Sequence, residues 1–266
     1  MTLAIPTAVL SIAGSDSCGA SGMQADLKTC AAFGVHGLSA ITAVTAQNLR
    51  SIKSVHRVPA REVERQIAAL FDDFDIGAVK IGMLGSAANV SAVARTLQRV
   101  GARNIVVDPV LVSSGGTVLL SVRGIAALRK ELIPLAALLT PNLPECRELL
   151  GRRVREDHAE AAAGDLLALG AGAVLLKGGH GRRDVVRDVL AVGRDVFEFR
   201  HPRLPVHARG TGCVLSSAIA CALAQGKPLL AAIDTAEQFL QQALRDAYRP
   251  GRRSLHVLHP APLRET

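Results

Sequence analysis

AVLSIAGSDSCGASGMQADLKT, residues 8–29, is the stretch that decides the fold. It begins with a short apolar run, Ala8–Ile12, passes through a glycine- and serine-rich segment, and continues into a longer segment that predicts a helix over Gly22–Phe33. A short apolar run that ends near glycine and leads into a helix is typical of a strand buried on both faces. The stretch therefore predicts one strand–loop–helix unit of an α/β protein.

The same alternation recurs along the chain and predicts a parallel sheet with helices on both faces, in a single domain over residues 1–266. Further strands are expected over Ala78–Ile81, Ile105–Val107, Leu138–Leu139 and Ala173–Leu176, with two more between Asp184 and Phe199. Helices are expected over Ala60–Phe71, Ser86–Val100, Val122–Glu131, Leu143–Leu150, His158–Leu169, Gly212–Gln225 and Leu229–Tyr248.

Polar, glycine-bearing segments follow the predicted strands. Ligands of open α/β sheets bind outside the carboxyl ends of the strands, so these segments predict one site along one edge of the sheet. They are Gly14-Ser15-Asp16, Lys80-Ile81-Gly82-Met83, Asp108-Pro109-Val110, Thr140-Pro141-Asn142 and Lys177-Gly178-Gly179-His180.

Composition excludes several classes of protein. The 266 residues are 49% hydrophobic and 20% charged, which indicates a globular chain. No apolar run approaches the roughly 18 residues that span a bilayer, and no basic segment precedes the first apolar residues, so we expect a cytoplasmic protein without a membrane partner. The five cysteines are odd in number and form no C-x-x-C pair, which argues against a disulfide framework or a zinc site.

The formal charge of +8 raises the question of a nucleic-acid partner. Aromatic residues make up only 3% of the chain and tryptophan is absent, so platforms for base stacking are scarce and we expect no nucleic acid. The arginines of residues 182–209 form either a solvated basic face or a positive field that attracts polyphosphate substrates.

Gly210-Thr211-Gly212-Cys213, at the start of a small-residue helix, is the strongest local signal. Free N–H groups and the positive end of the helix dipole would form an anion hole for a phosphoryl group. Cys213 in the first turn would have a lowered pKa and accept a proton from a substrate hydroxyl. An ordinary glycine-rich turn with a packed cysteine is the alternative.

Three further features bear on the site. The loop Gly14–Gly22 matches neither a dinucleotide fingerprint nor a Walker A loop, and Ser21 lacks the second glycine of a nucleophile elbow. Asn142 and Glu145 share one face of a helix start, where they either hold Mg²⁺ through its waters or form a helix cap. Lys177 ends a strand, either facing nucleotide phosphates or as an ordinary strand-end charge.

Taken together, the segments resemble the hydroxymethylpyrimidine/phosphomethylpyrimidine kinases of thiamine biosynthesis, which are ribokinase-like proteins. The resemblance covers about residues 8–243. It is carried by the segments above together with Gln24-Ala25-Asp26-Leu27-Lys28-Thr29, Ala40-Ile41-Thr42-Ala43, Thr45-Ala46-Gln47-Asn48 and Asn142-Leu143-Pro144-Glu145.

This resemblance implies a three-layer α/β/α fold with a central, mostly parallel sheet, usually as a homodimer, and an ATP- and Mg²⁺-dependent kinase acting on a small aminopyrimidine alcohol or its phosphate. Substrate would be bound by Asp26, Gln47, Gly14 and Met83. Catalysis would fall to Gly210, Thr211, Gly212 and Cys213, with Cys213 at the position of the base. ATP would be bound by Lys177, Asp108 and Arg209, and Mg²⁺ by Asn142 and Glu145.

The chain departs from the family pattern at three places, one of which is the arginine-rich stretch from Gly181 to Ala208. Gly19-Ala20-Ser21-Gly22 replaces Gly-Gly-Ala-Gly, and Ala208-Arg209 replaces Thr-His. Arg209 adds a fixed cation with a bidentate fork for phosphate. We therefore predict a preference for the monophosphate substrate over the free alcohol. Pyridoxal kinase activity on the same fold is the nearest alternative, and a non-catalytic pyrimidine-binding protein is a second.

Overall fold

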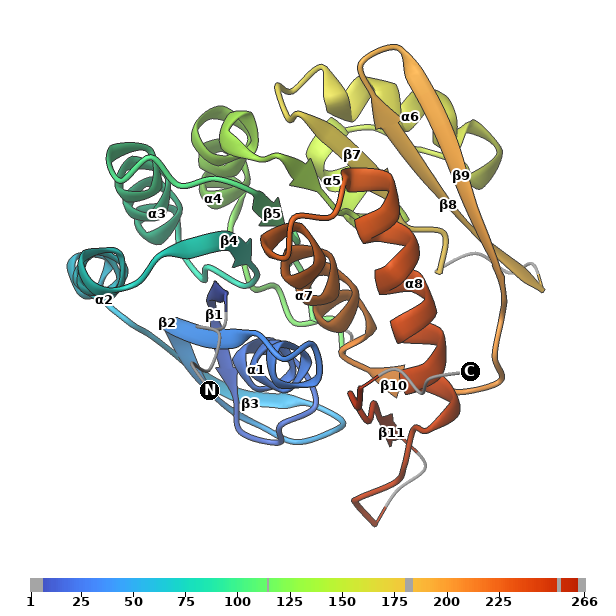
Figure 1. The fold of residues 1–266 in the computed structure, drawn as a ribbon, viewed down its shortest axis with the longest axis horizontal. Helices are drawn as coiled ribbons and strands as arrows, with labels where there is room; N and C mark the ends of the chain where they lie inside the picture. The colour runs from blue at the N-terminus through green and yellow to red at the C-terminus, as the bar shows by residue number, and fades with distance from the viewer. Residues whose placement is uncertain (1–6, 114, 180–183, 253–254, 263–266) are drawn as a thin grey trace, which may run out of the picture.

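A nine-stranded sheet runs through the chain in the order β3-β2-β1-β4-β5-β6-β7-β8-β9 (Figure 1). The structure is a computed structural model that describes residues 7–113, 115–179, 184–252 and 255–262. The strands are β1 (Ala8–Asp16), β2 (His36–Gln47), β3 (Ile52–Arg57), β4 (Ile76–Ile81), β5 (Ile105–Val107), β6 (Leu138–Leu139), β7 (Ala173–Leu176), β8 (Val185–Val192) and β9 (Asp195–Pro202). Strands β2, β1, β4, β5, β6 and β7 are parallel, whereas β3, β8 and β9 run antiparallel to their neighbours.

Helices cover both faces of this sheet and give the three-layer α/β/α architecture that was predicted. One face carries α2 (Ala60–Asp73), α3 (Ala87–Arg99), α4 (Val122–Ala127), α5 (Leu143–Leu150) and α6 (Ala159–Leu167). The other carries α1 (Gly22–Ala32), α7 (Thr211–Ala224) and α8 (Leu229–Arg245).

The strand sequence explains the two layers. Successive side chains of a strand point to opposite faces. Val9 of β1 accordingly packs with α1, α7 and α8, while its neighbour Leu10 packs into the opposite core. Because the central strands are buried on both faces, they read as continuous apolar runs, which is why their positions were predictable.

The elements missed by the sequence analysis are β2, β3 and a small second sheet of β10 (Ala208–Arg209) and β11 (His256–Val257). Strand β2 mixes exposed and buried residues without a continuous apolar run, and β3 is an edge strand with no fully buried side chain. The helix predicted over Val122–Glu131 ends as an α-helix at Ala127 and continues as a π-helical turn, Leu128–Leu132. Among the described residues, no helix has the length and apolar character to cross a membrane.

Candidate active site

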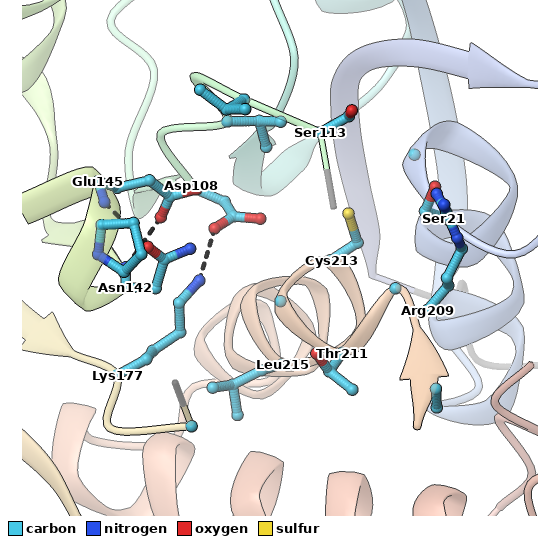
Figure 2. A pocket seen from close by; sticks show the side chains of 18 of the residues that line it. Ser21, Asp108, Ser113, Asn142, Glu145, Lys177, Arg209, Thr211, Cys213 and Leu215 are labelled. Atoms are coloured by element: carbon cyan, nitrogen blue, oxygen red, sulfur yellow. Dashed lines mark hydrogen bonds and ion pairs between the residues drawn. The ribbon is translucent and has the colours of Figure 1, made fainter. Parts of the chain in front are cut away.

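A cavity of about 900 Å³ lies where β1, β4 and β5 end and α7 begins (Figure 2). Of the thirteen predicted site residues, twelve line it, and only Asp26 does not. The twelve come from segments between Gly14 and Cys213, and the structure brings them together around one cavity. They are Gly14, Gln47, Met83, Asp108, Asn142, Glu145, Lys177, Arg209, Gly210, Thr211, Gly212 and Cys213.

The start of α7 forms one wall of the cavity. The N-cap Gly210 has φ +83°, and a Cβ there would lie 2.1 Å from the carbonyl oxygen of Ala20. The first hydrogen bond of the helix runs from the amide of Val214 to the carbonyl of Gly210, at 2.9 Å. Amides that precede this bond have no partner within the helix. The turn therefore presents the amides of Thr211 and Gly212 where an anion would bind.

Cys213 is half-buried, and its sulfur points into the cavity (Figure 2). Burial raises the pKa of its thiol to about 11. The Lys80 charge lowers this pKa, while the charges of Asp26 and Asp108 raise it. The prediction of a lowered pKa is therefore wrong: at a helix N-terminus that is dry and flanked by two carboxylates, desolvation outweighs the helix dipole. The thiol carries its proton at neutral pH.

Lys177 and Asp108 form a buried ion pair beside the same helix turn. Lys177 Nζ lies 2.8 Å from Asp108 Oδ1, and a Cβ on Gly212 would lie 3.2 Å from Nζ. Burial alone would lower the pKa of Lys177, but the charges of Asp108 and Glu145 raise it, so the ammonium stays charged. A fixed cation therefore stands next to the free amides of α7.

Asn142 and Glu145 form the helix cap that was the alternative to a metal site. The Asn142 side chain accepts from the amide of Glu145 at 2.9 Å, and Glu145 Oε2 accepts from the amide of Asn142 at 2.8 Å. Burial raises the pKa of Glu145 to about 7, with Lys177 lowering it and Asp108 raising it.

A divalent cation fits these residues. The second carboxylate oxygen of Glu145 is not used by the cap, and the repulsion from Asp108 that raises the Glu145 pKa is what a cation would relieve. No cluster of three or more His, Cys, Asp or Glu side chains in the described part of the chain has the geometry of a tight metal site. The donors suit an ion that keeps most of its waters, as Mg²⁺ does.

The other end of the cavity is built by β1, β2 and β4. A Cβ on Gly14 would lie 3.0 Å from the sulfur of Met83, so these two residues are in contact. The Gln47 backbone is fixed by Ser17, whose hydroxyl donates to the Gln47 carbonyl at 2.8 Å and accepts from its amide at 2.9 Å. This end combines a thioether and a glycine with one side-chain amide, which suits a small flat polar ring.

Asp26 does not line the cavity. Its side chain is fully buried on α1 and lies 2.8 Å from Lys80 Nζ. The hydroxyls of Ser11 and Ser217 donate to the same carboxylate, at 2.6 and 2.8 Å. The expectation that Asp26 binds the pyrimidine is therefore not met. A carboxylate buried on a helix face needs hydrogen-bond donors to replace water, and here buried side chains of the protein supply them.

Lys80 was expected only as part of the Lys80–Met83 segment, and sequence reasoning assigned it no role of its own. It is fully buried, yet it reaches the cavity wall and acts on the charge of Cys213. Burial would lower the pKa of Lys80, and the charge of Asp26 raises it above its ordinary value. A lysine within an apolar strand, Ile76–Ile81, was the available signal, since lysine is almost never buried without a partner.

Asp16 organises the glycine-rich loop. Its carboxylate accepts from the amides of Cys18, Ala20 and Ser21, at 2.9, 3.2 and 2.9 Å. The loop is thereby folded against the start of α7, where the Ala20 carbonyl meets Gly210. Only its position at a predicted strand end indicated Asp16 before the structure was known.

Arg209 lies on β10, and Figure 2 shows its side chain beside Ser21, the N-cap residue of α1. Its Nη2 atom lies 3.8 Å from the position of a Cβ on Gly115. The arginine thus stands between two glycine-bearing loops on the cavity wall. Two other expectations lie partly outside the described residues: His180 of the Lys177–His180 segment, and the first residues of the arginine-rich stretch 182–209.

The three-layer fold with an open helix N-terminus at one cavity is shared with solved small-molecule kinases, which places the chain in the ribokinase-like class. A family model described as phosphomethylpyrimidine kinase matches residues 16–258. The hydroxymethylpyrimidine/phosphomethylpyrimidine kinase of Rhizobium meliloti is 45% identical over 257 residues, covering 94% of this chain and 96% of that protein. The chain belongs to the phosphomethylpyrimidine kinase family.

Two solved structures resemble the fold. The pyridoxal kinase of Bacillus subtilis, an ADP complex, is 30% identical with a TM-score of 0.89, covering 96% of this chain and 98% of that one. The phosphomethylpyrimidine kinase of Clostridium difficile is 36% identical with a TM-score of 0.79, covering 89% and 99%.

Proposed function

We propose that this chain transfers the γ-phosphoryl group of ATP to 4-amino-5-hydroxymethyl-2-methylpyrimidine, to its monophosphate, or to both. The product of the second step is the pyrimidine diphosphate used for thiamine biosynthesis. The observation that carries the proposal is the place of Cys213, on the first turn of α7 and within the cavity that Gln47 and Met83 also line. Family membership over residues 16–258 supports the same reaction.

The residues take the following roles in this proposal. Gln47, Gly14 and Met83 hold the pyrimidine ring, and the amides of Gly210, Thr211 and Gly212 bind the phosphoryl group in transfer. Lys177 neutralises phosphate charge and Asp108 holds that lysine in place. Asn142 and Glu145 hold Mg²⁺ through water, and the ion would neutralise charge on the phosphates. ATP use is supported by the ADP complex of the Bacillus subtilis relative.

In the reaction, a substrate oxygen attacks the γ-phosphorus while the bond to the β-γ bridging oxygen breaks. The transition state of phosphoryl transfer is loose, so the proton of an attacking hydroxyl leaves late, passing to an oxygen of the transferred phosphoryl group, and base strength matters little. A protonated Cys213 is compatible with this order of events. Its first role is to hold the attacking hydroxyl in line by hydrogen bonding, and positioning of that kind carries much of the rate.

The test is ADP release with MgATP, comparing the pyrimidine alcohol, its monophosphate and pyridoxal, in the wild type and Cys213→Ala. Turnover of either pyrimidine, lost in the variant, is the expected result and shows which step is performed. Turnover of pyridoxal alone would make the chain a pyridoxal kinase, an alternative that rests on 30% identity to the Bacillus subtilis enzyme and is less supported than the pyrimidine kinase, which rests on 45%. Absence of turnover with all three substrates would leave a binding protein.

Arg209 bears on which of the two pyrimidine substrates is preferred. Its guanidinium lies on the cavity wall beside the glycine-rich loop, where it would bind the phosphate of a monophosphate substrate. We expect the monophosphate to have the higher kcat/KM, and Arg209→His to reduce that preference about tenfold. Equal turnover of both substrates, unchanged in Arg209→His, would refute this preference and leave the kinase assignment intact. A cytoplasmic homodimer completes the proposal.

A further inference from the structure

The segment that leads into α7 is held by a strand from the C-terminal part of the chain. Strand β10 lines the cavity, and its last residue, Arg209, is followed directly by Gly210, the N-cap of α7. Strand β10 pairs with β11 in parallel register, with Arg209 opposite Val257. The amide of His256 donates to the carbonyl of His207 at 3.0 Å. The chain segment that enters the helix turn is therefore attached to β11.

Strand β11 is the partner that fixes β10. In the part of the chain that the structure describes, the backbone hydrogen bonds of residues 204–209 to another element are made with β11 alone. The sheet that β10 and β11 form has two strands, so β10 has no second strand neighbour there. A strand with a single neighbour can shift when that neighbour is lost, because no other ladder of hydrogen bonds holds it.

Strand β11 is itself anchored to the body of the molecule. The amide of Val257 donates to the carbonyl of Tyr248 at 2.9 Å, and the amide of Tyr248 donates back at 3.1 Å, just beyond the end of α8. The side chains of Val257 and Leu258 are buried, and Leu258 packs in the core that α7 and α8 share. The anchor of β11 is therefore independent of β10.

The same C-terminal part of the chain also reaches the pyrimidine end of the cavity. A Cβ on Gly251 would lie 3.4 Å from Cδ1 of Leu49, which follows Gln47 by two residues. The Arg249 Nε donates to His256 Nε2 at 3.0 Å and so connects this contact to β11. Residues on either side of the cavity thus meet the same segment.

The position of β10 determines the position of the helix turn. Consecutive Cα atoms are about 3.8 Å apart, so Gly210 moves whenever Arg209 moves. On its other side Gly210 lies against the glycine-rich loop, where a Cβ would be 2.1 Å from the Ala20 carbonyl oxygen. Donors that bind a reacting group must be placed accurately, since a displacement of about 1 Å can cost about 10²-fold in rate.

We propose that the C-terminal strand β11 is a positioning element of the active site, and that the backbone amide of His256 is its contact with β10. Through β10 it holds the amides of Gly210, Thr211 and Gly212 where the phosphoryl group in transfer binds. The identity of this ligand rests on the proposed kinase function. Loss of the contact weakens binding of the transferring phosphoryl group and leaves ADP, which Lys177 also faces, bound nearly as before.

His256→Pro tests this inference because proline has no amide hydrogen and is tolerated as the first residue of a strand. Ala261→Pro is the matched control, since the Ala261 amide has no hydrogen-bond partner among the described residues. Calorimetry measures the Kd of ADP, and then of ADP with Mg²⁺, aluminium fluoride and the pyrimidine alcohol. The fluoride complex stands in for the phosphoryl group in transfer.

His256→Pro should weaken the fluoride complex about tenfold or more and change the Kd of ADP less than about twofold. Ala261→Pro should match the wild type in both. A Kd does not depend on how much of the sample is folded, and the calorimetric stoichiometry gives that fraction. A loss of stability alone therefore leaves the ratio of the two Kd values unchanged.

A wild-type ratio of the two Kd values in folded His256→Pro would overturn the role of β11, as would an equal loss of affinity for both ligands. If His256→Pro does not fold, Val257→Ala decides, because it loosens the buried anchor and keeps every backbone hydrogen bond. It should weaken the fluoride complex more than ADP, and a wild-type ratio would overturn the inference. Absence of ADP binding by the wild type would instead refute the kinase assignment.

Discussion

Cys213 lies between one buried lysine and two carboxylates, and its environment decides what chemistry the thiol performs. Burial is the largest influence on the pKa of this thiol, so burial determines the outcome and keeps the thiol neutral. A neutral thiol is a poor nucleophile, since the thiolate is the reactive form. The residue is therefore expected to be a slow target for alkylating agents despite its access to the cavity.

Alkylation with iodoacetamide tests this charge state. In a Cys18→Ser background, which removes the other partly exposed cysteine, the modification rate of Cys213 should still rise above pH 9 and level off only near pH 11. Mass spectrometry of the peptide follows the rate, and Cys213→Ser gives the blank. A plateau at neutral pH would mean that the thiolate is stabilised and that Cys213 is ionised before substrate binds.

The Asp26–Lys80 pair is a second residue-scale test, because both groups are fully buried. Lys80→Met leaves a buried carboxylate uncompensated and should lower the free energy of unfolding by about 3–5 kcal/mol. The double variant Asp26→Leu/Lys80→Met should recover most of that loss. Urea unfolding of the three proteins measures it, and a double variant no more stable than Lys80→Met would show that the serine hydrogen bonds to Asp26 dominate.

Residue roles were only partly predictable from the sequence. Gly210 and Cys213 sit in one contiguous segment whose local conformation determines the site, so their place in the cavity followed from the sequence. Asp26 and Lys80 are 54 positions apart, and their pairing depends on how α1 packs against β4. Whether a carboxylate faces a ligand or a buried lysine depends on tertiary packing, and a local sequence pattern cannot predict it.

At the scale of elements, the start of α7 depends on the conformation of Gly210. Gly226, just after α7, provides a matched control: its φ is +84°, nearly that of Gly210, but a Cβ there would meet no atom within 4 Å. Gly210→Ala adds both the strain of positive φ and a collision with the Ala20 carbonyl, whereas Gly226→Ala adds the strain alone.

Gly210→Ala should therefore lower kcat about 10²-fold or more, the effect of displacing one anion-hole donor. Gly226→Ala should cost about 1–2 kcal/mol of stability and leave kcat unchanged. Steady-state kinetics and thermal unfolding of both variants give the comparison. Equal kcat values would contradict the assignment of an anion hole to this turn.

The start of α5 has a capping role and a proposed metal-binding role, and one substitution can separate the two. Glu145→Gln keeps a side-chain oxygen for the Asn142 amide, so the cap and the stability should change by less than about 1 kcal/mol. The variant loses its negative charge, so the Mg²⁺ concentration for half-maximal activity should rise about tenfold. An Mg²⁺ titration of activity measures it. An unchanged Mg²⁺ requirement would leave Glu145 as a capping residue alone.

Elements were predictable where one burial pattern extends over the whole segment. Strands β5, β6 and β7 are apolar throughout and their predicted bounds are confirmed, as is the pair β8 and β9. Strand β2 alternates irregularly between exposed and buried positions because it lies between the parallel core and the edge strand β3. Its period is too irregular to distinguish a strand from a loop.

At the scale of the whole molecule, the chain has a net charge of +8, and its cavity would bind a polyanion under the proposed function. A net positive field raises the local concentration of anions and speeds their association. The field of exposed charges is screened within about 10 Å at about 0.1 M salt, whereas the buried Lys177–Asp108 pair is screened much less. Salt therefore separates long-range attraction from contacts within the site.

The two pyrimidine substrates make this separation measurable, because one is neutral and the other is a phosphate. Raising the salt concentration from about 0.02 M to about 0.3 M should increase the KM for ATP and for the monophosphate several-fold, while the KM for the neutral alcohol stays constant. Steady-state kinetics at fixed Mg²⁺ provide the values. If the KM values of all three rise together, salt disturbs the fold or the metal site, and the positive charge is only a solvated face. If none changes, the local contacts of Lys177 and the α7 amides suffice to bind the phosphates.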